Sequence, residues 1–552
     1  NDLEALKNTG YVLKPFVDYW ALLLHLDETP DIEVQTFLDQ YADFSFADRL
    51  RTEWLKKLAK NGNWTQFFAV YAKEKVHKDI GLSCYATLGN IYSQQLVRQD
   101  IWALWSHAEI LPSQCNQVFA WGIKQGVISK KAIWARLRLS LRADNLPLAL
   151  AISKDLPDTV NLKKVLPQIK KSPQSLDHHL AAVGSAQTRV ELILYAVELL
   201  AKNNLELAIV RYQQWQHRLP PEARAFAWGR IALYAARAHH PDALHWYALT
   251  TPQQFETEQF VWWARAALRK SRWHTLLDII NVMPNAMADE PGWRYWRARA
   301  LKETAHPTEA QAIWEKLASE RNYYGYLASD ELNLPPPACV VYTPSEVGLT
   351  SISELPAIQR AVALLNLNMR WEGRLEWDWA VRNLDEETLL VVAEYAYRQG
   401  WLDMAISTAE KVHTLCNLKW SYPQPYAEVF QEIAKTTLVD EAWLYGIAHQ
   451  ESRFMLKAKS GVGAQGLMQV MPETADWIAK RVGLQFDSTV DPYALNTNIE
   501  LGAHYMRHIL EVMRGHKVMA TAAYNAGPRR AKKWQDKIPL EAVIYIETIP
   551  FN

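Results

Sequence analysis

The chain has little of what membrane-spanning proteins and exported precursors need. Its 552 residues contain no run of about 18 uncharged apolar residues, so the sequence predicts no transmembrane segment. The first residues, NDLEALKN, have neither the basic nor the apolar stretch of an export signal. We therefore expect that any export signal has already been removed, and this absence fits a cytosolic protein and a processed exported protein equally.

An excess of charge of either sign is also missing. Lys and Arg together number 60, and so do Asp and Glu. From Tyr426 onward the count is again balanced, with 14 basic and 14 acidic residues. A protein that binds nucleic acid or an anionic membrane mainly by charge needs a basic field. The sequence therefore predicts no nucleic-acid partner.

Cysteine is scarce, with four residues and no CxxC pair, which argues against a zinc ribbon or a thioredoxin-type site. Cys84 and Cys115 lie 31 positions apart and flank a predicted helix turn. They can meet as a disulfide, which would indicate an oxidising compartment. The alternative is that all four, including Cys339 and Cys416, are buried free thiols.

Glycine is rare relative to large aromatic residues: there are 21 Gly against 24 Trp and 24 Tyr. Strand-rich proteins depend more on Val, Thr and glycine-rich turns. The composition therefore predicts an all-α fold in which aromatic rings pack helices together.

A tryptophan repeat runs through the middle of the chain. WGRIAL, WARAAL and WRARAL begin at Trp228, Trp263 and Trp296, at spacings of 35 and 33. A second tryptophan follows 18 residues after the first in two copies, at Trp246 and Trp314. A period near 34 is typical of stacked helix pairs, each of which buries its face against its neighbours. We therefore expect an α-solenoid.

Proline-rich segments divide the chain into three predicted domains. LNLPPPACVVYTPSE, at Leu332–Glu346, cannot be helical and ends the solenoid, which we place at residues 1–345. A second break, SYPQPY, falls at residues 421–426. The sequence thus predicts a helical linker domain at 346–425 and a terminal domain at 426–552.

One helix of the terminal domain places an acid on its apolar face. Asp440 is suited to cap EAWLYGIAHQES, in which Leu444, Ile447 and Ala448 form an i, i+3, i+4 stripe. The next position on that stripe is Glu451. Loss of hydration disfavours the charged carboxylate and raises its pKa, so such a group can deliver a proton near neutral pH. The alternative is that Glu451 ends the helix and points into water.

Short helices and turns follow this acid. KSGVGAQG brings three glycines close together, which predicts a tightly bent backbone, and a new helix is expected from Pro472 with Gly483 at its C-cap. In ATAAYNAGPRRAKKW we expect a helix, a turn at Asn525–Gly527 and another helix from Pro528.

Four short motifs of the terminal domain occur in a recognisable order. They are ES at 451–452, GLMQ at 466–469, AAYNAG at 522–527 and IETIPF at 546–551. In order and spacing they resemble the catalytic domain of the soluble lytic transglycosylases. The resemblance implies a ring-like helical superhelix, a linker domain and a lysozyme-like catalytic domain, in agreement with the Trp repeat and the proline breaks.

The resemblance also implies a reaction. Peptidoglycan would be cleaved between N-acetylmuramic acid and N-acetylglucosamine, with an internal hydroxyl instead of water as the acceptor and with no cofactor or metal. Glu451 would act first as acid and then as base, giving a 1,6-anhydro product. This accounts for the lack of a second candidate carboxylate, because Glu473 and Asp476 are better explained as first-turn residues that complement a helix dipole.

Six further residues match positions that bind substrate in the family. Ser460, Gln469 and Met471 would line the sugar groove, the Tyr524 hydroxyl would lie near the reacting atoms, and a second carboxylate would bind substrate without replacing the acid. The full set is Ser460, Gln469, Met471, Tyr524, Asn525 and Glu547. Two of these have simpler explanations, since Met471 can be a packing residue and Asn525 can cap a helix.

The family also implies a cellular setting. It favours a Cys84–Cys115 disulfide and a monomer in the periplasm of a Gram-negative bacterium, with possible association with the outer membrane through an N-terminal lipid signal. The implied partners are peptidoglycan strands and, through the superhelix, proteins of cell-wall synthesis or hydrolysis.

Three rival functions follow from the same sequence. His504 and His508 lie four apart on a predicted helix and can face one metal ion, although no third ligand is evident. The solenoid can instead serve a non-catalytic scaffold, because solenoids offer large concave binding surfaces. A true hydrolase of the same fold would differ only in its product.

Overall fold

The computed structural model describes residues 12–72, 79–95, 97–156, 161–484, 491–535 and 540–550. Within these ranges the regular structure consists of helices, and β-pairing is limited to three isolated bridges: Val340 with Leu415, Lys459 with Gln465 and Gln465 with Val470. The predicted all-α class is confirmed. The chain divides into two compact units, Asn1–Ala267 and Leu268–Asn552.

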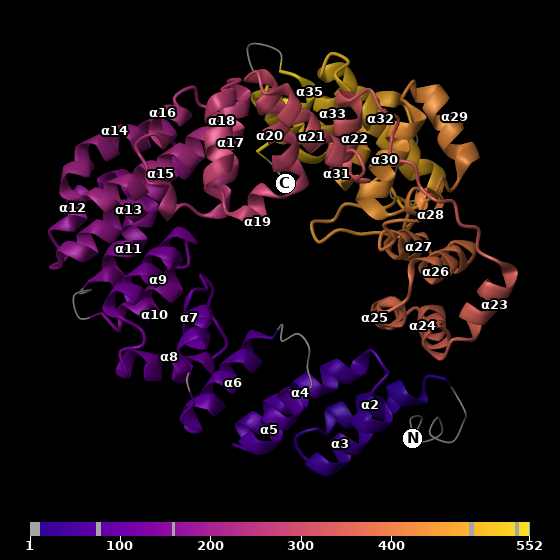
Figure 1. Cartoon of the computed structure of the whole chain (residues 1–552), viewed down its shortest axis with the longest axis horizontal. Helices are drawn as coiled ribbons and strands as arrows, with labels where there is room; N and C mark the ends of the chain where they lie inside the picture. The colour runs from indigo at the N-terminus through magenta and orange to yellow at the C-terminus, as the bar shows by residue number, and fades with distance from the viewer. Residues whose placement is uncertain are drawn as a thin grey trace. The chain divides into compact units, whose positions relative to one another are not determined.

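The first unit is a succession of short helices, drawn from indigo to magenta in Figure 1. Its α-helices are α2 (Lys14–Leu24), α3 (Asp31–Gln40), α4 (Phe46–Lys60), α5 (Trp64–Tyr71), α6 (Ile80–Tyr92), α7 (Arg98–Trp105), α8 (Cys115–Lys124), α9 (Lys130–Arg142), α10 (Leu146–Ser153), α11 (Leu162–Lys171), α12 (Asp177–Leu180), α13 (Ala186–Asn203), α14 (Leu205–Trp215), α15 (Pro221–Arg237), α16 (Ala243–Tyr247) and α17 (Thr257–Arg269). Short 3-10 turns occur at Pro173–Ser175, Gln216–Arg218 and Pro252–Gln254.

The tryptophan repeat corresponds to successive helices. Trp228 lies on α15 and Trp246 on α16, and their rings stack with centroids 6.4 Å apart. Trp263 lies on α17 and stacks on Tyr247 of α16 at 5.6 Å. Large rings therefore fill the space between neighbouring helices, as the composition predicts.

Buried polar links reinforce the packing of the first unit. Cys84 of α6 and Cys115 of α8 are joined in a disulfide with both residues fully buried. Glu198 of α13 is 4% exposed and accepts two hydrogen bonds from Arg230 of α15, each of 2.7 Å. The Tyr234 hydroxyl donates to the same carboxylate at 2.7 Å. The charge of Glu198 is thus matched inside the helical stack.

The second unit contains the remaining helices. They are α18 (Trp273–Val282), α19 (Asn285–Ala288), α20 (Pro291–Glu303), α21 (Pro307–Leu317), α22 (Tyr323–Glu331), α23 (Glu346–Glu354), α24 (Pro356–Asn366), α25 (Arg370–Val381), α26 (Glu386–Arg398), α27 (Leu402–Ala409), α28 (Leu418–Ser421), α29 (Ala427–Thr437), α30 (Glu441–Ser452), α31 (Pro472–Val482), α32 (Leu495–Val512), α33 (Lys517–Ala526), α34 (Pro528–Lys533) and α35 (Ala542–Glu547).

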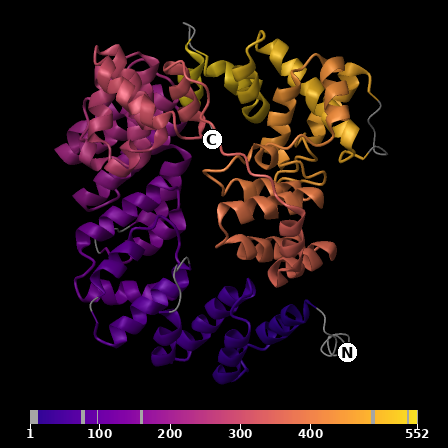
Figure 2. The same cartoon turned by 45° about the vertical axis from the view of Figure 1, so that its right-hand side comes forward.

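Both proline-rich breaks interrupt the helices as predicted: α22 ends at Glu331 and α23 begins at Glu346, and no helix covers residues 422–426. Between the breaks, α23 to α28 form the orange group visible in Figure 2, with a buried core that includes Trp377 and Trp420. Cys339 and Cys416 are joined in a second disulfide, so the alternative of four free thiols is wrong.

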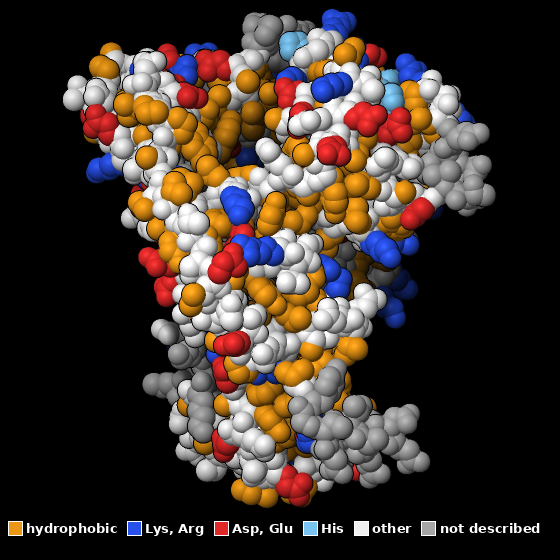
Figure 3. Space-filling view, turned by 90° about the vertical axis from the view of Figure 1, so that its right-hand side faces the viewer, with side chains coloured by type: hydrophobic (Ala, Val, Ile, Leu, Met, Phe, Trp, Pro, Cys, Tyr) orange, Lys and Arg blue, Asp and Glu red, His pale blue; other side chains and the backbone are white. Residues whose placement is uncertain are grey.

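Two surface properties bear on partners. In the described ranges, no helix combines the length and the apolar character needed to cross a bilayer. The face of the molecule in Figure 3 carries basic and acidic side chains interspersed with one another. This mixed surface agrees with the equal numbers of Lys plus Arg and Asp plus Glu.

Candidate active site

Helix α30 places Glu451 on a mostly apolar face, as the sequence predicts. The Asp440 carboxylate caps the helix by accepting a hydrogen bond from the Trp443 amide at 3.2 Å, and it pairs with Lys517 of α33 at 2.9 Å. Leu444 and Ala448 are fully buried on the same stripe. Glu451 follows one turn later, in the last turn of the helix.

Glu451 opens into a pocket of about 400 Å³ in the second unit. The other lining residues come from α33 and from three positions further along the chain, Trp534, Ile546 and Ile549. Most lining side chains are apolar: the full set is Ile447, Gln450, Glu451, Val518, Thr521, Ala522, Tyr524, Asn525, Ala526, Trp534, Ile546 and Ile549. Among these described lining residues Glu451 is the only carboxylate, and Tyr524 is the only other titratable group.

The environment of Glu451 favours its protonated form. The side chain is half-buried, and this burial raises the pKa of the carboxyl above its ordinary value. Within the part of the chain that the structure describes, the carboxyl makes neither a hydrogen bond nor a salt bridge that would stabilise its charge. The alternative of a helix end that points freely into water is therefore not what the structure contains.

Tyr524 stands beside the acid. Its hydroxyl donates a 2.6 Å hydrogen bond to the carbonyl of Met468, and its ring packs against Tyr505 with centroids 5.4 Å apart. Burial raises the pKa of Tyr524 well above its ordinary value, and the negative charge of Glu451 raises it further. Tyr524 consequently stays neutral and acts only through hydrogen bonding.

The glycine-rich loop between α30 and α31 is held in its conformation by hydrogen bonds between its own residues. Ser460 Oγ accepts from the Ala464 amide at 2.9 Å. The Gln469 side-chain amide donates to the carbonyls of Ala458 at 3.1 Å and Gly466 at 2.9 Å. The structure therefore places Ser460 and Gln469 within the loop and not among the side chains that line the pocket.

Asn498 of α32 secures this loop and was not singled out from the sequence. It is 2% exposed, accepts from the Met468 amide at 2.8 Å and donates to the Gln465 carbonyl at 3.0 Å. Gly466 has a positive φ of 75°, and a Cβ at this position would overlap the Asn498 side chain. The available signal was a polar residue beside Ile499 on the apolar face of a long amphipathic helix.

The other predicted residues fall in different places. Met471 is 40% exposed at the N-cap of α31 and is not among the residues that line the pocket. Asn525 is also exposed, but it lines the pocket. The predicted turn at Asn525–Gly527 is wrong in extent, because the Gly527 amide still donates to the Ala523 carbonyl and α33 runs to Ala526. Only Gly527, with φ of 85°, leaves the helix.

Glu547 lies at the end of α35, next to Ile546 of the pocket wall. Its side chain accepts hydrogen bonds from Trp296 Nε1 at 3.1 Å and from the Tyr324 hydroxyl at 2.6 Å. It is not among the residues that line the pocket. Phe551, the last residue of the fourth motif, is outside the described residues.

Four wall residues were not identified from the sequence. Val518, Trp534, Ile546 and Ile549 supply much of the apolar surface around the acid. Ile546 and Ile549 both belong to the recognised IETIPF motif, but no periodicity indicates that they turn toward Glu451. Their role depends on tertiary packing.

His508, one of the two histidines four positions apart on α32, packs against an aromatic ring. The His508 ring meets Trp477 edge-on with centroids 4.8 Å apart, and burial lowers the pKa of this histidine. In the ranges described above, no group of three or more His, Cys, Asp or Glu side chains is arranged to hold a metal ion.

Two family models match segments of the second unit. A model described as the transglycosylase SLT domain matches residues 428–540, and one described as the soluble lytic murein transglycosylase L domain matches residues 351–412. The soluble lytic murein transglycosylase of Escherichia coli K12 is 23% identical over 566 residues, covering 98% of this chain and 85% of that protein.

Two solved structures resemble the whole chain. An inactive glutamate-to-glutamine mutant of the lytic transglycosylase Slt from Pseudomonas aeruginosa matches with a TM-score of 0.82 and 28% identity, over 100% of this chain and 90% of that one. The 70 kDa soluble lytic transglycosylase of E. coli matches with a TM-score of 0.69 and 22% identity over the same shares, which concerns the fold.

Proposed function

The chain belongs to the soluble lytic transglycosylase family and is a lytic transglycosylase of peptidoglycan, and from this premise we propose that Glu451 alone carries its acid and base chemistry. The bond cleaved is the β-1,4 linkage between N-acetylmuramic acid and N-acetylglucosamine. One observation supports this most. The half-buried carboxyl of Glu451 has no charged partner among the described residues, and it is the one acid among the residues that line the apolar pocket.

In the first step, protonated Glu451 donates its proton to the glycosidic oxygen. The bond from the muramoyl C1 to that oxygen breaks, and the N-acetylglucosamine leaves with a hydroxyl. A raised pKa suits this step, because a carboxyl that keeps its proton near neutral pH is an effective general acid. The acetamido group of the substrate stabilises the positive charge that develops at C1, which removes the need for a second carboxylate.

In the second step, the Glu451 carboxylate takes the proton of the muramoyl C6 hydroxyl. The C6 oxygen bonds to C1 and closes a 1,6-anhydro ring, and Glu451 is again protonated. No water is consumed. Exclusion of water by Trp534, Ile546 and Ile549 favours attack by the internal hydroxyl over hydrolysis.

Tyr524 assists without exchanging its own proton. Because its hydroxyl donates to the Met468 carbonyl, the phenol oxygen faces the site as a hydrogen-bond acceptor with a fixed position. We infer that it orients either the Glu451 carboxyl or a sugar hydroxyl. The same hydrogen bond joins the glycine-rich loop to α33.

The other residues expected to bind substrate lie on the pocket surface or in and beside the glycine-rich loop. Asn525 lies on the pocket surface and is suited to bind a sugar hydroxyl. Ser460, Gln469 and Met471 would contribute through the loop that they shape or flank, and Glu547 is assigned a different role below.

The setting of the enzyme is also proposed. Two disulfides support an oxidising compartment, and we infer the periplasm. We further propose a monomer with a ring-like solenoid at residues 1–345, a linker domain at 346–425 and a catalytic domain at 426–552. Outer-membrane association and binding of cell-wall proteins through the solenoid stay predictions.

Product analysis tests the reaction. Purified peptidoglycan is digested with the protein and the soluble fragments are analysed by mass spectrometry. The proposal expects muropeptides that are lighter by one water than those with a reducing end. Products with ordinary reducing ends would instead assign the pocket to a hydrolase.

Glu451→Gln tests the acid. The amide keeps the shape of the side chain but donates no acidic proton, so turnover should be lost while binding to glycan strands is retained. Glu473→Gln on the exposed first turn of α31 is the matched control and should retain full activity. Retained turnover in Glu451→Gln would show that Glu451 is not the acid of the reaction, whereas a wild-type protein that binds glycan strands without cleaving them would favour the scaffold function.

A further inference from the structure

The C-terminal wall of the pocket is held by residues far away in the sequence. Arg269, the last residue of α17, belongs to the second unit and donates to Thr548 Oγ1 at 2.9 Å and to the Trp534 carbonyl at 3.4 Å. Thr548 is fully buried. Arg299 of α20 forms a 3.0 Å salt bridge with Glu541, just before α35. Arg269 and Arg299 therefore fix this segment at several points.

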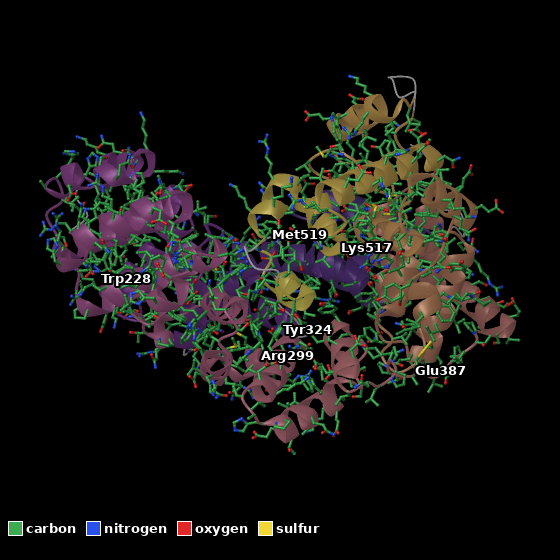
Figure 4. The ribbon with its side chains drawn as sticks, turned by 90° about the horizontal axis from the view of Figure 1, so that it is seen from above. Trp228, Arg299, Tyr324, Glu387, Lys517 and Met519 are labelled. Atoms are coloured by element: carbon green, nitrogen blue, oxygen red, sulfur yellow. A yellow bond between two sulfur atoms is a disulfide. The ribbon has the colours of Figure 1, made fainter. Side chains whose placement is uncertain are left out.

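Glu547 is the central contact of this attachment. One oxygen, Oε2, accepts both the indole N–H of Trp296 on α20 and the hydroxyl of Tyr324 on α22. Trp296 is 1% exposed, so its donor is held in one direction. Gly292 leaves space for Tyr324, since a Cβ there would lie 3.0 Å from the Tyr324 ring. Figure 4 shows Arg299 and Tyr324 near one another beside a short gold helix of the C-terminal segment.

Two anchored residues lie between two pocket residues along this backbone. Ile546 and Ile549 line the pocket. Between them, Glu547 binds to Trp296 and Tyr324, and Thr548 binds to Arg269, all within the second unit. Because the four residues are consecutive, fixing the inner two determines where the outer two point. A shift of this segment would move apolar surface away from Glu451.

Building on the proposed function, we propose that Glu547 is a positioning residue. Its carboxylate is held by Trp296 and Tyr324. It thereby keeps Ile546 and Ile549 in place as the apolar wall that excludes water from the Glu451 pocket. This role differs from the substrate-binding role that the family resemblance implies for Glu547. It makes the last helices of the Trp repeat part of the active-site support. The two roles predict different kinetics.

Three variants separate the two roles: Tyr324→Phe, Glu547→Gln and Tyr326→Phe. Tyr324→Phe removes only the hydroxyl that donates to Glu547 and keeps the ring packing. Tyr326 lies on the same helix, is 39% exposed and serves as the matched control. The readouts are kcat and KM on soluble glycan strands as a function of pH, together with the melting temperature of each variant.

The positioning role predicts a lower kcat and a displaced pH profile. We expect Tyr324→Phe and Glu547→Gln to lower kcat on the order of tenfold, because small displacements of a catalytic site are costly, with little change in KM. A looser wall admits water, which lowers the pKa of Glu451, so the alkaline limb of kcat/KM should move to lower pH. The double variant should be no worse than the poorer single one, and Tyr326→Phe should match the wild type.

Two results would overturn the proposal. A raised KM in Glu547→Gln, with kcat and the alkaline limb unchanged, would assign this residue to substrate binding. A wild-type pH profile in Tyr324→Phe would also contradict it, even if the melting temperature fell. Glu451→Gln distinguishes these outcomes from failure of the proposed function: if Glu451→Gln is inactive while Tyr324→Phe behaves as wild type, only the positioning role fails.

Discussion

Two glutamates, Glu198 of α13 and Glu451 of α30, show what determines whether a carboxylate that is shielded from solvent is structural or reactive. Glu198 is 4% exposed and receives two hydrogen bonds from Arg230 and one from Tyr234. Glu451 is less buried, yet no described residue compensates its charge, and burial raises its pKa. The degree of burial therefore does not identify which carboxylate is the reacting group. The absence of a compensating partner identifies it.

The difference has a thermodynamic reason. A matched buried ion pair keeps both groups charged and structural, and removal of one partner leaves the other uncompensated. An unmatched carboxyl is most stable when protonated, so it can donate a proton. One site strengthens the helix stack, and the other retains a destabilised ionised state that catalysis can use.

The largest expected effect comes from removing the unmatched acid. Glu451→Gln should lower kcat by about 10²–10⁴-fold, the usual contribution of a general acid or base. Release of soluble muropeptides from peptidoglycan measures it. Normal activity in this variant, with Glu473→Gln equally active, would show that the unmatched carboxyl is not the reacting group.

Breaking the matched pair should affect stability instead. Glu198→Gln leaves the Arg230 charge without its partner, and we expect a loss of about 3–5 kcal/mol in the free energy of unfolding. Urea denaturation followed by circular dichroism gives the value. Glu206→Gln on α14, whose side chain is 76% exposed, is the control and should change stability by less than about 1 kcal/mol. Equal effects in both variants would remove the distinction between matched and exposed charges.

The first unit can also be tested through its disulfide. Replacing Cys84 and Cys115 together by Ser should lower the free energy of unfolding by about 2–4 kcal/mol, because the unfolded chain is no longer restrained. Specific activity of the folded protein should stay near that of the wild type. Comparison of the melting curves of the wild type with and without a reductant provides an independent check. A melting temperature that is unchanged both by the double substitution and by the reductant would contradict the prediction.

Tyr524→Phe sharpens the account of the pocket. The substitution removes the hydrogen bond to Met468 and the hydroxyl beside Glu451 but keeps the ring. We expect kcat to fall on the order of tenfold through poorer orientation of the reacting groups. Tyr422→Phe, at a side chain that is 65% exposed, is the control. An unchanged kcat in Tyr524→Phe would restrict Tyr524 to packing.

The smallest expected effect concerns the stability of Glu451→Gln. A group with a raised pKa in the folded state favours folding below its unfolded pKa, and that contribution is lost as pH rises through the folded pKa. Relative to the wild type, Glu451→Gln should therefore gain stability as pH rises through this range and show no difference in acid. Thermal melts at several pH values test the sign, and a variant less stable than wild type at neutral pH would contradict it.

Features that depend on local spacing could be predicted from the sequence. The apolar stripe of α30, the cap at Asp440, the helix start at Pro472 and the αL glycine at Gly483 all follow from neighbours in the chain. The Trp repeat likewise indicated stacked helices, because packing within a solenoid is between consecutive elements.

Features that depend on residues far apart in the chain could not be predicted from the sequence. The wall segment around Ile546 is fixed by Arg269, Trp296 and Tyr324, more than 200 positions away. Asn498 reaches the glycine-rich loop from another helix. A single sequence carries no signal for such pairings, because periodicity shows which face of a helix is apolar but not which element covers it.

The most direct test of the account is a site-specific titration of Glu451. Carbon NMR of side-chain carboxyls, with the signal assigned by its loss in Glu451→Gln, gives the pKa of this group in the intact protein. The account predicts a value above that of an ordinary glutamate and in agreement with the alkaline limb of kcat/KM. A pKa at or below the ordinary value would contradict the claim that a dry, unmatched carboxyl performs the reaction.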